Sequence, residues 1–339
     1  MKIESQMKNQ HSEPELRQDP VSGDWIIIAP GRGTRPHMAR GVAVKRKKSP
    51  KKGCPFEDPQ ASGNSEPVLV YPNKENWQVQ VLENKYPALR HHDVCATPRV
   101  SGPFERLQAN GHHDVIITRD HQQNFPRLSP NEANQLFQAF RDRYLTLSAD
   151  PCIEYAFFFH NWGPAAGASV YHPHYQVIAL PVVPPDVHHS LEGSRRFFEE
   201  KNKCVHCEMI LWEQKDKARV IFENDKAIAF APFVSRSPYE VRIFPKQHQP
   251  NFESALDSDV SAAVEALQFT LRKMEKNLGD PDYNFFLHTA PMKEKDKYGH
   301  YHWHIEVIPR LNIRASFELG TGVEINDVDP DAAAKILRK

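Results

Sequence analysis

Apolar residues follow a helical spacing in two long segments of the chain and form short runs between them. The helical spacing covers residues 131–147 and 258–278. Short aromatic runs at residues 154–161 and 284–289 are typical of strands. Because several strands accompany each helix, the pattern favours an α+β fold over alternating strand–helix–strand units.

The order of these elements occurs twice. The segment VIITRDHQQNF (115–125) resembles VRIFPKQHQPNF (241–252), and each is followed by a predicted helix, an aromatic strand and a histidine-bearing strand that ends in proline. The repeat predicts two copies of one module, residues 15–190 and 191–339. We expect an antiparallel sheet in each copy, with its long helix packed on one face.

Histidines recur at similar spacing in the two copies. His121 precedes His172 by 51 residues, and His248 precedes His300 by 52 residues. A cysteine-containing segment also precedes the repeated segment in each copy, at Cys54 and at Cys204. This spacing predicts that His300 corresponds to His172.

The composition narrows the class of protein. The 339 residues include 43 Lys+Arg and 43 Asp+Glu, so no strong field would attract nucleic acid or a membrane surface. No apolar run approaches the roughly 20 residues that span a bilayer, and the N-terminal residues lack the apolar stretch of a secretion signal. Five cysteines are too few for a disulfide scaffold. We expect a cytoplasmic enzyme.

The second cysteine segment is a candidate zinc site. Cys204 and Cys207 form a Cys-x-x-Cys pair, which can fill two corners of a zinc tetrahedron. The repeat nominates His248 and His300 for the other two. An ordinary buried thiol pair is the alternative, and a redox pair lacks the expected strand–helix–strand context.

The first cysteine segment predicts a related site. Cys54, His121 and His172 are the corresponding ligands, and Glu57 stands where the second cysteine would be. Zinc accepts carboxylate oxygen, so this set can hold the metal. Cys54 and Glu57 could instead be turn residues only, which leaves one or two Zn²⁺ ions per chain.

The strand after His172 carries the candidate catalytic residues. Residues two apart on a strand project from the same face, so His172, His174 and Gln176 are predicted to form one row. Pro173 within this row predicts an edge or the start of a strand. A neutral imidazole is a good nucleophile towards phosphorus, which makes His174 the candidate.

The loop before this strand is suited to phosphate. Residues 161–169, NWGPAAGAS, are mostly small, so backbone amides and the Ser169 hydroxyl could surround a phosphoryl group. Gln176 could donate to a non-bridging oxygen. A tight turn is the plainer interpretation of the loop by itself, but its place directly before the histidine strand favours phosphate.

These motifs resemble the galactose-1-phosphate uridylyltransferase family, a branch of the histidine-triad superfamily. The resemblance runs from about Leu16 to Arg338 and includes LRQDPVSGDWIIIAPGRGTRP, CPFE, NKYPAL, RDHQQNFPRLS, HPHYQ and HYHWHIEVIP. It implies a duplicated histidine-triad-like fold, a homodimer, and ping-pong transfer of uridylyl from UDP-glucose to a hexose 1-phosphate.

The resemblance also implies roles for individual residues. His174 would become uridylylated, Gln176 would hold the phosphoryl oxygen, and His172 would bind zinc with Cys54 and His121. The nucleotide and phosphate contacts that the resemblance implies are Arg17, Arg32, Arg35, Asn84, Asn161, Gly167 and Ser169.

Several enzymatic alternatives remain open. The segment Phe317–Gly322 reads FELGTG where well-known family members carry a Tyr-Glu pair, and it looks closer to the branch that includes ADP-glucose phosphorylases. Phosphate would then accept the nucleotidyl group. A related hydrolase, or a non-catalytic zinc- or nucleotide-binding protein, completes the alternatives.

The second copy poses a separate question. Its strand HYHWH aligns His302 with His174 and His304 with Gln176, but it lacks the small-residue loop. A nucleophile without donors for the phosphoryl oxygens is poorly supported. We therefore expect metal binding by His300, and packing or substrate contacts by His302 and His304.

Overall fold

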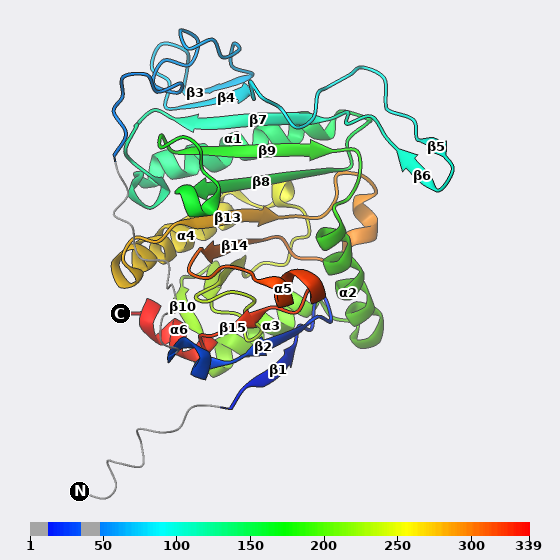
Figure 1. Cartoon of the computed structure of the whole chain (residues 1–339), viewed down its shortest axis with the longest axis vertical. Helices are drawn as coiled ribbons and strands as arrows, with labels where there is room; N and C mark the ends of the chain where they lie inside the picture. Colours follow the sequence, from blue (N-terminus) through cyan, green and yellow to red (C-terminus); the bar gives the residue numbers. More distant parts are fainter. Residues whose placement is uncertain (1–12, 35–47) are drawn as a thin grey trace, which may run out of the picture.

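The computed structural model describes residues 13–34 and 48–339. The centre of the fold is a ten-stranded sheet in which every neighbouring pair is antiparallel. Figure 1 shows this sheet running through both halves of the chain. In spatial order its strands are β10 (Val220–Glu223), β11 (Ala227–Phe230), β12 (Val241–Pro245), β14 (His304–Pro309), β13 (Tyr283–His288), β8 (Tyr155–Trp162), β9 (His174–Leu180), β7 (His112–Thr118), β4 (Val79–Glu83) and β3 (Leu69–Tyr71).

The two copies of the module are joined through their sheets. Strand β8 of the first copy pairs with β13 of the second, from Tyr283 opposite Trp162 to Leu287 opposite Phe158. We expected one sheet in each copy, whereas the structure has one continuous sheet. Pairing the two edges satisfies backbone groups that would otherwise be exposed.

Two long helices cover one face of the sheet, as the repeat predicts. They are α1 (Pro130–Ser148) and α4 (Asp257–Leu278), and both lie behind the strands in Figure 1. Helix α1 begins at a capping box in which Ser129 and Glu132 satisfy each other's backbone N–H groups. Phe140 of α1 and Leu267 of α4 belong to the same buried cluster as alternate side chains of the central strands. The duplicated α+β prediction is therefore confirmed.

The opposite face is covered unevenly. Helix α3 (Val205–Asp216) and a small sheet lie over the second copy, and α2 (Pro185–Lys201) packs at one end. The small sheet contains β1 (Glu15–Gln18), β2 (Trp25–Ile28) and β15 (Ile325–Asn326). The remaining helices are α5 (Ser316–Thr321) and α6 (Pro330–Leu337). No helix among the described residues is long and apolar enough to cross a membrane.

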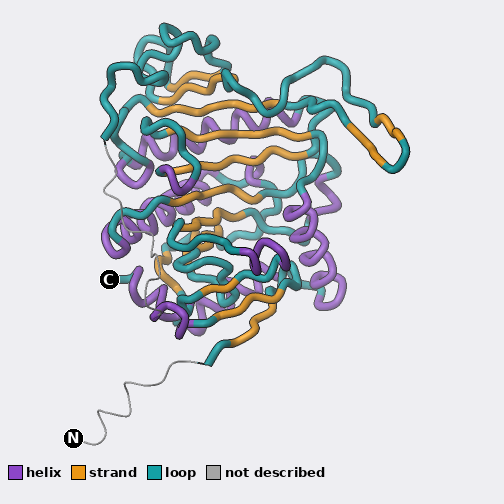
Figure 2. Tube along the Cα trace, viewed as in Figure 1, coloured by secondary structure: helices purple, strands orange, loops and turns teal. Residues whose placement is uncertain are grey.

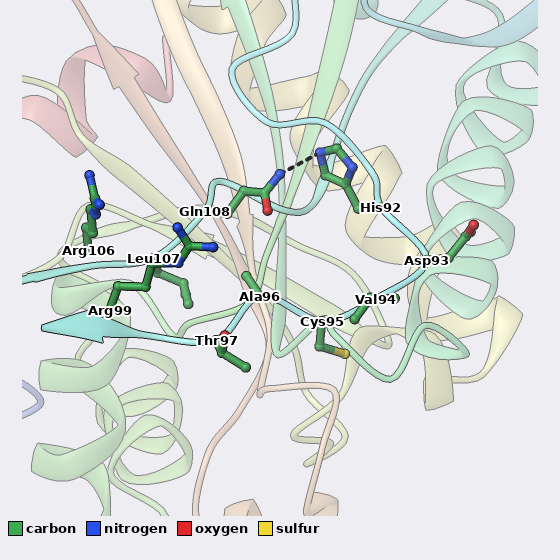
Figure 3. Close-up of a pocket in the computed structure, with 10 residues that line it drawn as sticks. All are labelled: His92, Asp93, Val94, Cys95, Ala96, Thr97, Arg99, Arg106, Leu107 and Gln108. Carbon is green, nitrogen blue, oxygen red and sulfur yellow. Dashed lines mark hydrogen bonds between the residues drawn. The ribbon is translucent and has the colours of Figure 1, made fainter.

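A hairpin arm projects from the first copy, as Figures 1 and 2 show. It contains β5 (Arg99–Ser101) and β6 (Phe104–Arg106). A disulfide between Cys95 and Cys152 ties the base of the arm to the segment after α1. Figure 3 shows a pocket between the two segments that form the arm, where Gln108 is hydrogen-bonded to His92. This pocket contains none of the site residues that the sequence predicts.

Candidate active site and metal-ligand clusters

Strand β9 places His174 and Gln176 on the sheet face that the long helices leave open. The intervening Tyr175 packs in the core against the helix side, as the period of two requires. Pro173 directly precedes the strand, so its missing N–H costs no ladder hydrogen bond. The strand itself is central, between β7 and β8, rather than at an edge.

The hydrogen bonds of the His174 ring define its chemistry. Nδ1 lies 2.9 Å from the carbonyl oxygen of His172, and because a carbonyl can only accept, Nδ1 carries the proton. The lone pair is therefore on Nε2. Burial lowers the pKa of His174 below its ordinary value, which keeps the ring neutral at pH 7. The residue is 7% exposed, and the Phe56 ring packs 5.3 Å from it.

Gln176 belongs to a polar network that links three strands. Its Oε1 lies 2.9 Å from His113 Nε2 at the start of β7, and Asn84 Nδ2 lies 3.1 Å from the same nitrogen. The structure thus brings Asn84 and Gln176 together around the His113 ring. His113 is absent from the sequence predictions, because only the pairing of β4, β7 and β9 brings it there.

The small-residue loop begins with the last two residues of β8 and lies beside His174. Asn161 succeeds His160, which pairs with Tyr175 of β9. Gly163 has φ of +86° and ψ of 162°, a conformation suited to glycine, and a side chain there would overlap Asp282. Gly167 has φ of +89°, and a Cβ on it would lie 3.8 Å from Asn161 Nδ2. Ser169 is exposed on the same loop.

The first metal-ligand cluster contains Cys54, His121 and His172, as predicted. Cys54 Sγ lies 3.6 Å from His172 Nδ1, and a Glu57 oxygen lies 3.5 Å from His121 Nδ1. Both rings donate their Nε2–H to backbone carbonyls, those of Ser49 and Thr118. Each Nδ1 lone pair is therefore directed into the cluster.

The second cluster contains Cys204, Cys207, His248 and His302. Cys207 Sγ lies 3.3 Å from His248 Nδ1 and 3.5 Å from His302 Nδ1. His302, rather than the predicted His300, completes the set. His300 packs instead beside the rings of Phe198 and Tyr298.

The reason for this correction is the alignment of the two copies. His304 begins β14 and donates from Nδ1 to the carbonyl of His302 at 3.0 Å, just as His174 begins β9 and bonds to His172. His304 therefore corresponds to His174, two residues from our expectation. A shift of two residues leaves every side chain on the same face, so the HxHxH pattern cannot reveal the error.

The same alignment shows which residues of the second copy occupy the positions around His174 in the first. Glu306 stands in the place of Gln176, and Arg242 lies between Glu240 at 3.2 Å and Asp19 at 3.6 Å. Although burial opposes ionisation, the neighbouring Arg242 guanidinium and His288 hold the pKa of Glu306 below its ordinary value. An ionised carboxylate accepts hydrogen bonds and repels a phosphoryl oxygen. At the position of Gln176 the second copy thus has a carboxylate, in a pocket that also holds Arg242 and His288.

The predicted arginines lie apart from His174 in the described chain. Arg17 bonds to the carbonyl of Phe233 and to Asp329, and it stacks on the Phe233 ring. Arg32 is exposed in a short 3-10 helix, Pro30–Thr34. Arg35 lies outside the described residues.

Comparisons with known proteins place this site in a family. The galactose-1-phosphate uridyl transferase N-terminal domain matches residues 3–184, and DUF4921, a domain of unknown function, matches residues 105–338. The chain is 34% identical to an ADP-glucose phosphorylase of Arabidopsis thaliana, covering 97% of this chain and 94% of the relative. It is 30% identical to a galactose-1-phosphate uridylyltransferase of Thermotoga maritima, covering 96% and 98%.

Solved structures agree with these relatives. An Arabidopsis thaliana ADP-glucose phosphorylase with bound ADP-glucose has a TM-score of 0.83 and 32% identity, and the match covers 97% of this chain and 99% of that chain. A uridylyltransferase structure has a TM-score of 0.73 and 27% identity, with 96% and 97% covered. The fold and the histidine site define a nucleotidyltransferase-type enzyme. The chain belongs to the galactose-1-phosphate uridylyltransferase family.

Proposed function

We propose that the protein transfers a nucleotidyl group from a nucleotide sugar through a covalent bond to His174. Nε2 of the neutral ring attacks the α-phosphorus; an N–P bond forms, and the P–O bond to the sugar 1-phosphate breaks. An oxygen of the acceptor phosphate then attacks the same phosphorus and returns the electron pair to Nε2. The fixed tautomer of His174, with its lone pair on Nε2, carries this proposal.

Two nucleotide sugars are candidate substrates for a member of this family. Adenylyl transfer from ADP-glucose to inorganic phosphate is the first candidate, because the ADP-glucose phosphorylase shares 34% identity and a TM-score of 0.83. Uridylyl transfer from UDP-glucose to a hexose 1-phosphate is the second, because a uridylyltransferase shares 30% identity over 98% of its own length. The FELGTG segment beginning at Phe317 favours ADP-glucose.

We propose Zn²⁺ at both clusters of cysteine and histidine. Two thiols and two imidazoles form a donor set that zinc prefers. In the first cluster, His121 Nδ1 and Glu57 Oε2 are buried without a hydrogen-bond partner among the described residues, and a cation between them would satisfy both. When bound, zinc would fix the loop around Cys54 against His172, which precedes the catalytic strand.

We assign the polar groups around His174 to the phosphoryl oxygens. Gln176 and Asn161 would donate to them, with Ser169 at the open side. The Gly167 N–H donates instead to the Pro164 carbonyl, which shapes the loop. The roles of Asn84 and of Arg17, Arg32 and Arg35 in nucleotide binding stay predictions, as do a homodimer, a cytoplasmic location and two modules divided at residue 190.

The test is covalent labelling. The purified protein is incubated with ADP-glucose or UDP-glucose labelled at the α-phosphorus, and the intact mass identifies AMP or UMP on the chain. We expect labelling to disappear in His174→Ala and to persist in His188→Ala, a matched change at an exposed histidine of α2. Labelling of His174→Ala at the wild-type level would overturn the proposal, and release of free nucleotide by water alone would favour a hydrolase.

A further inference from the structure

Three side-chain amides near His174 have their oxygen atoms engaged by the protein. Asn84 Oδ1 accepts from a backbone N–H at 2.9 Å, Asn161 Oδ1 accepts from Asn284 Nδ2 at 2.8 Å, and Gln176 Oε1 lies 2.9 Å from a nitrogen of His113. A side-chain amide can present either its oxygen or its NH₂ group. Phosphoryl oxygens only accept, so the orientation of each amide decides whether it attracts or repels them.

The orientation of Gln176 follows from the tautomer of His113. The backbone N–H of Ala88 points at His113 Nδ1 at 3.0 Å, so Nδ1 is the acceptor and the neutral ring carries its proton on Nε2. Near Nε2 lie the NH₂ group of Asn84 and the amide of Gln176. The Asn84 NH₂ group cannot accept this hydrogen, so its 3.1 Å contact with Nε2 is not a hydrogen bond, and the Nε2–H bonds to the oxygen of Gln176. The NH₂ group of Gln176 is left for another acceptor.

The orientation of Asn161 follows from the second copy of the module. Asn284 of β13 donates from Nδ2 to the backbone carbonyl of Ala166 at 2.9 Å, which fixes that atom as nitrogen. The same nitrogen donates to Asn161 Oδ1. The NH₂ group of Asn161 is consequently turned away from Asn284, towards Gly167. The backbone carbonyl of Ala166 thereby determines, through Asn284, which way the Asn161 amide points.

We propose that His113 and Asn284 are positioning residues that hold the NH₂ groups of Gln176 and Asn161 towards the phosphoryl oxygens. This inference rests on the proposed function of His174. Without His113, the Gln176 amide loses the bond that distinguishes its two orientations, so the NH₂ group is no longer held towards the anion before the reaction begins. Donors set before the reaction stabilise transition-state charge without reorganising during it.

The kinetic test is single-turnover nucleotidylation of His174 at saturating nucleotide sugar. We expect His113→Phe, which keeps a ring but has no N–H, to lower the rate constant by about tenfold to a hundredfold, with a smaller change in the apparent dissociation constant. His113→Gln can return an N–H to Gln176 and should recover part of the rate. His188→Phe, at an exposed position of α2, is the matched control and should react as the wild type does.

A double-mutant cycle separates positioning from general damage. In a Gln176→Ala background no amide remains to orient, so adding His113→Phe should change the rate constant by less than about twofold. A purely structural role would lower the fraction of chains labelled at the end point and the thermal stability in both backgrounds. Equal slowing by His113→Phe in both backgrounds would overturn the proposal.

Asn284 is tested in the same assay. Asn284→Asp replaces the donor by a carboxylate that repels the Ala166 carbonyl and accepts from Asn161, which should turn the NH₂ group of Asn161 away from the substrate and slow nucleotidylation by about tenfold or more. Asn134→Asp, on the surface of α1, is the control. A wild-type rate constant in Asn284→Asp would remove Asn284 from the proposal.

A measurement without substrate keeps the two proposals distinct. Nitrogen-15 NMR, with signals assigned by their loss in His113→Phe, reports the tautomer of His113 directly. We expect the Nε2–H form, and an Nδ1–H form would overturn the positioning role whatever the activity. If the wild type forms no adduct on His174, the proposed function fails, and the tautomer result still decides the geometry of Gln176.

Discussion

Replacing His302 by alanine should remove one zinc ion, while replacing His300 should not. His302 lies 3.5 Å from Cys207 Sγ in a cluster with Cys204 and His248. His300 is two residues away, similarly buried, and packs beside Phe198. Both variants remove a buried imidazole, so a difference between their zinc contents reports metal binding by His302 rather than general loss of packing.

The magnitude follows from the donor set. Structural zinc sites contribute about 10–16 kcal/mol in small peptides, which divided among four donors is about 3 kcal/mol for each. A loss of about 3 kcal/mol corresponds to a zinc affinity lower by about a hundredfold. It should also lower the unfolding temperature by about 5 °C. His300→Ala should cost only the packing of one imidazole.

The assay is metal content after dialysis against a weak chelator. We expect two zinc ions per chain in the wild type and in His300→Ala, and one in His302→Ala. Nucleotidylation of His174 should persist in His302→Ala, since the affected cluster lies in the other copy of the module. Loss of zinc from His300→Ala together with full retention in His302→Ala would refute the alignment of the two histidine strands.

Two further predictions concern single positions. Gly163→Ala should slow nucleotidylation and lower the free energy of unfolding by about 1–3 kcal/mol, because the positive φ and the Asp282 carboxylate both oppose a side chain; urea denaturation measures the loss, and an unchanged midpoint and rate would contradict the argument. Arg143→Met should cost about 3–5 kcal/mol, because it leaves Asp114, 1% exposed and bonded to Arg143 at 2.7 Å, without its partner. Replacing both residues by apolar ones should restore part of the stability, and denaturation that is no better in the double variant would contradict the reasoning.

Much of the fold could be predicted from the sequence because its signals are local. The helical spacing of residues 131–147 and 258–278 and the repeated histidine strands establish a duplicated α+β module. The shared face of His174 and Gln176 follows from the two-residue period of a strand. The single continuous sheet could not be predicted, because the β8–β13 pairing joins segments more than 100 residues apart. The hydrophobic pattern of neither strand indicates which strand it pairs with.

The disulfide of the arm illustrates a second limit. Cys95 and Cys152 are 57 residues apart, and nothing in their neighbouring residues links them. The Cys-x-x-Cys pair at Cys204 was readable because both ligands lie in one turn. Distant partners become visible only when the chain has folded.

The sequence by itself determined which chemical groups the protein has and which of them share a strand face. It nominated the candidate nucleophile, the amide beside it and most residues of the two cysteine–histidine clusters, since residue type and short spacing carry that information. The tertiary structure decided that His302 rather than His300 completes the second cluster, because strand periodicity is blind to a shift of two residues. It also decided the partners of Gln176 and Asn161, because hydrogen bonds between strands depend on register, which no single segment encodes.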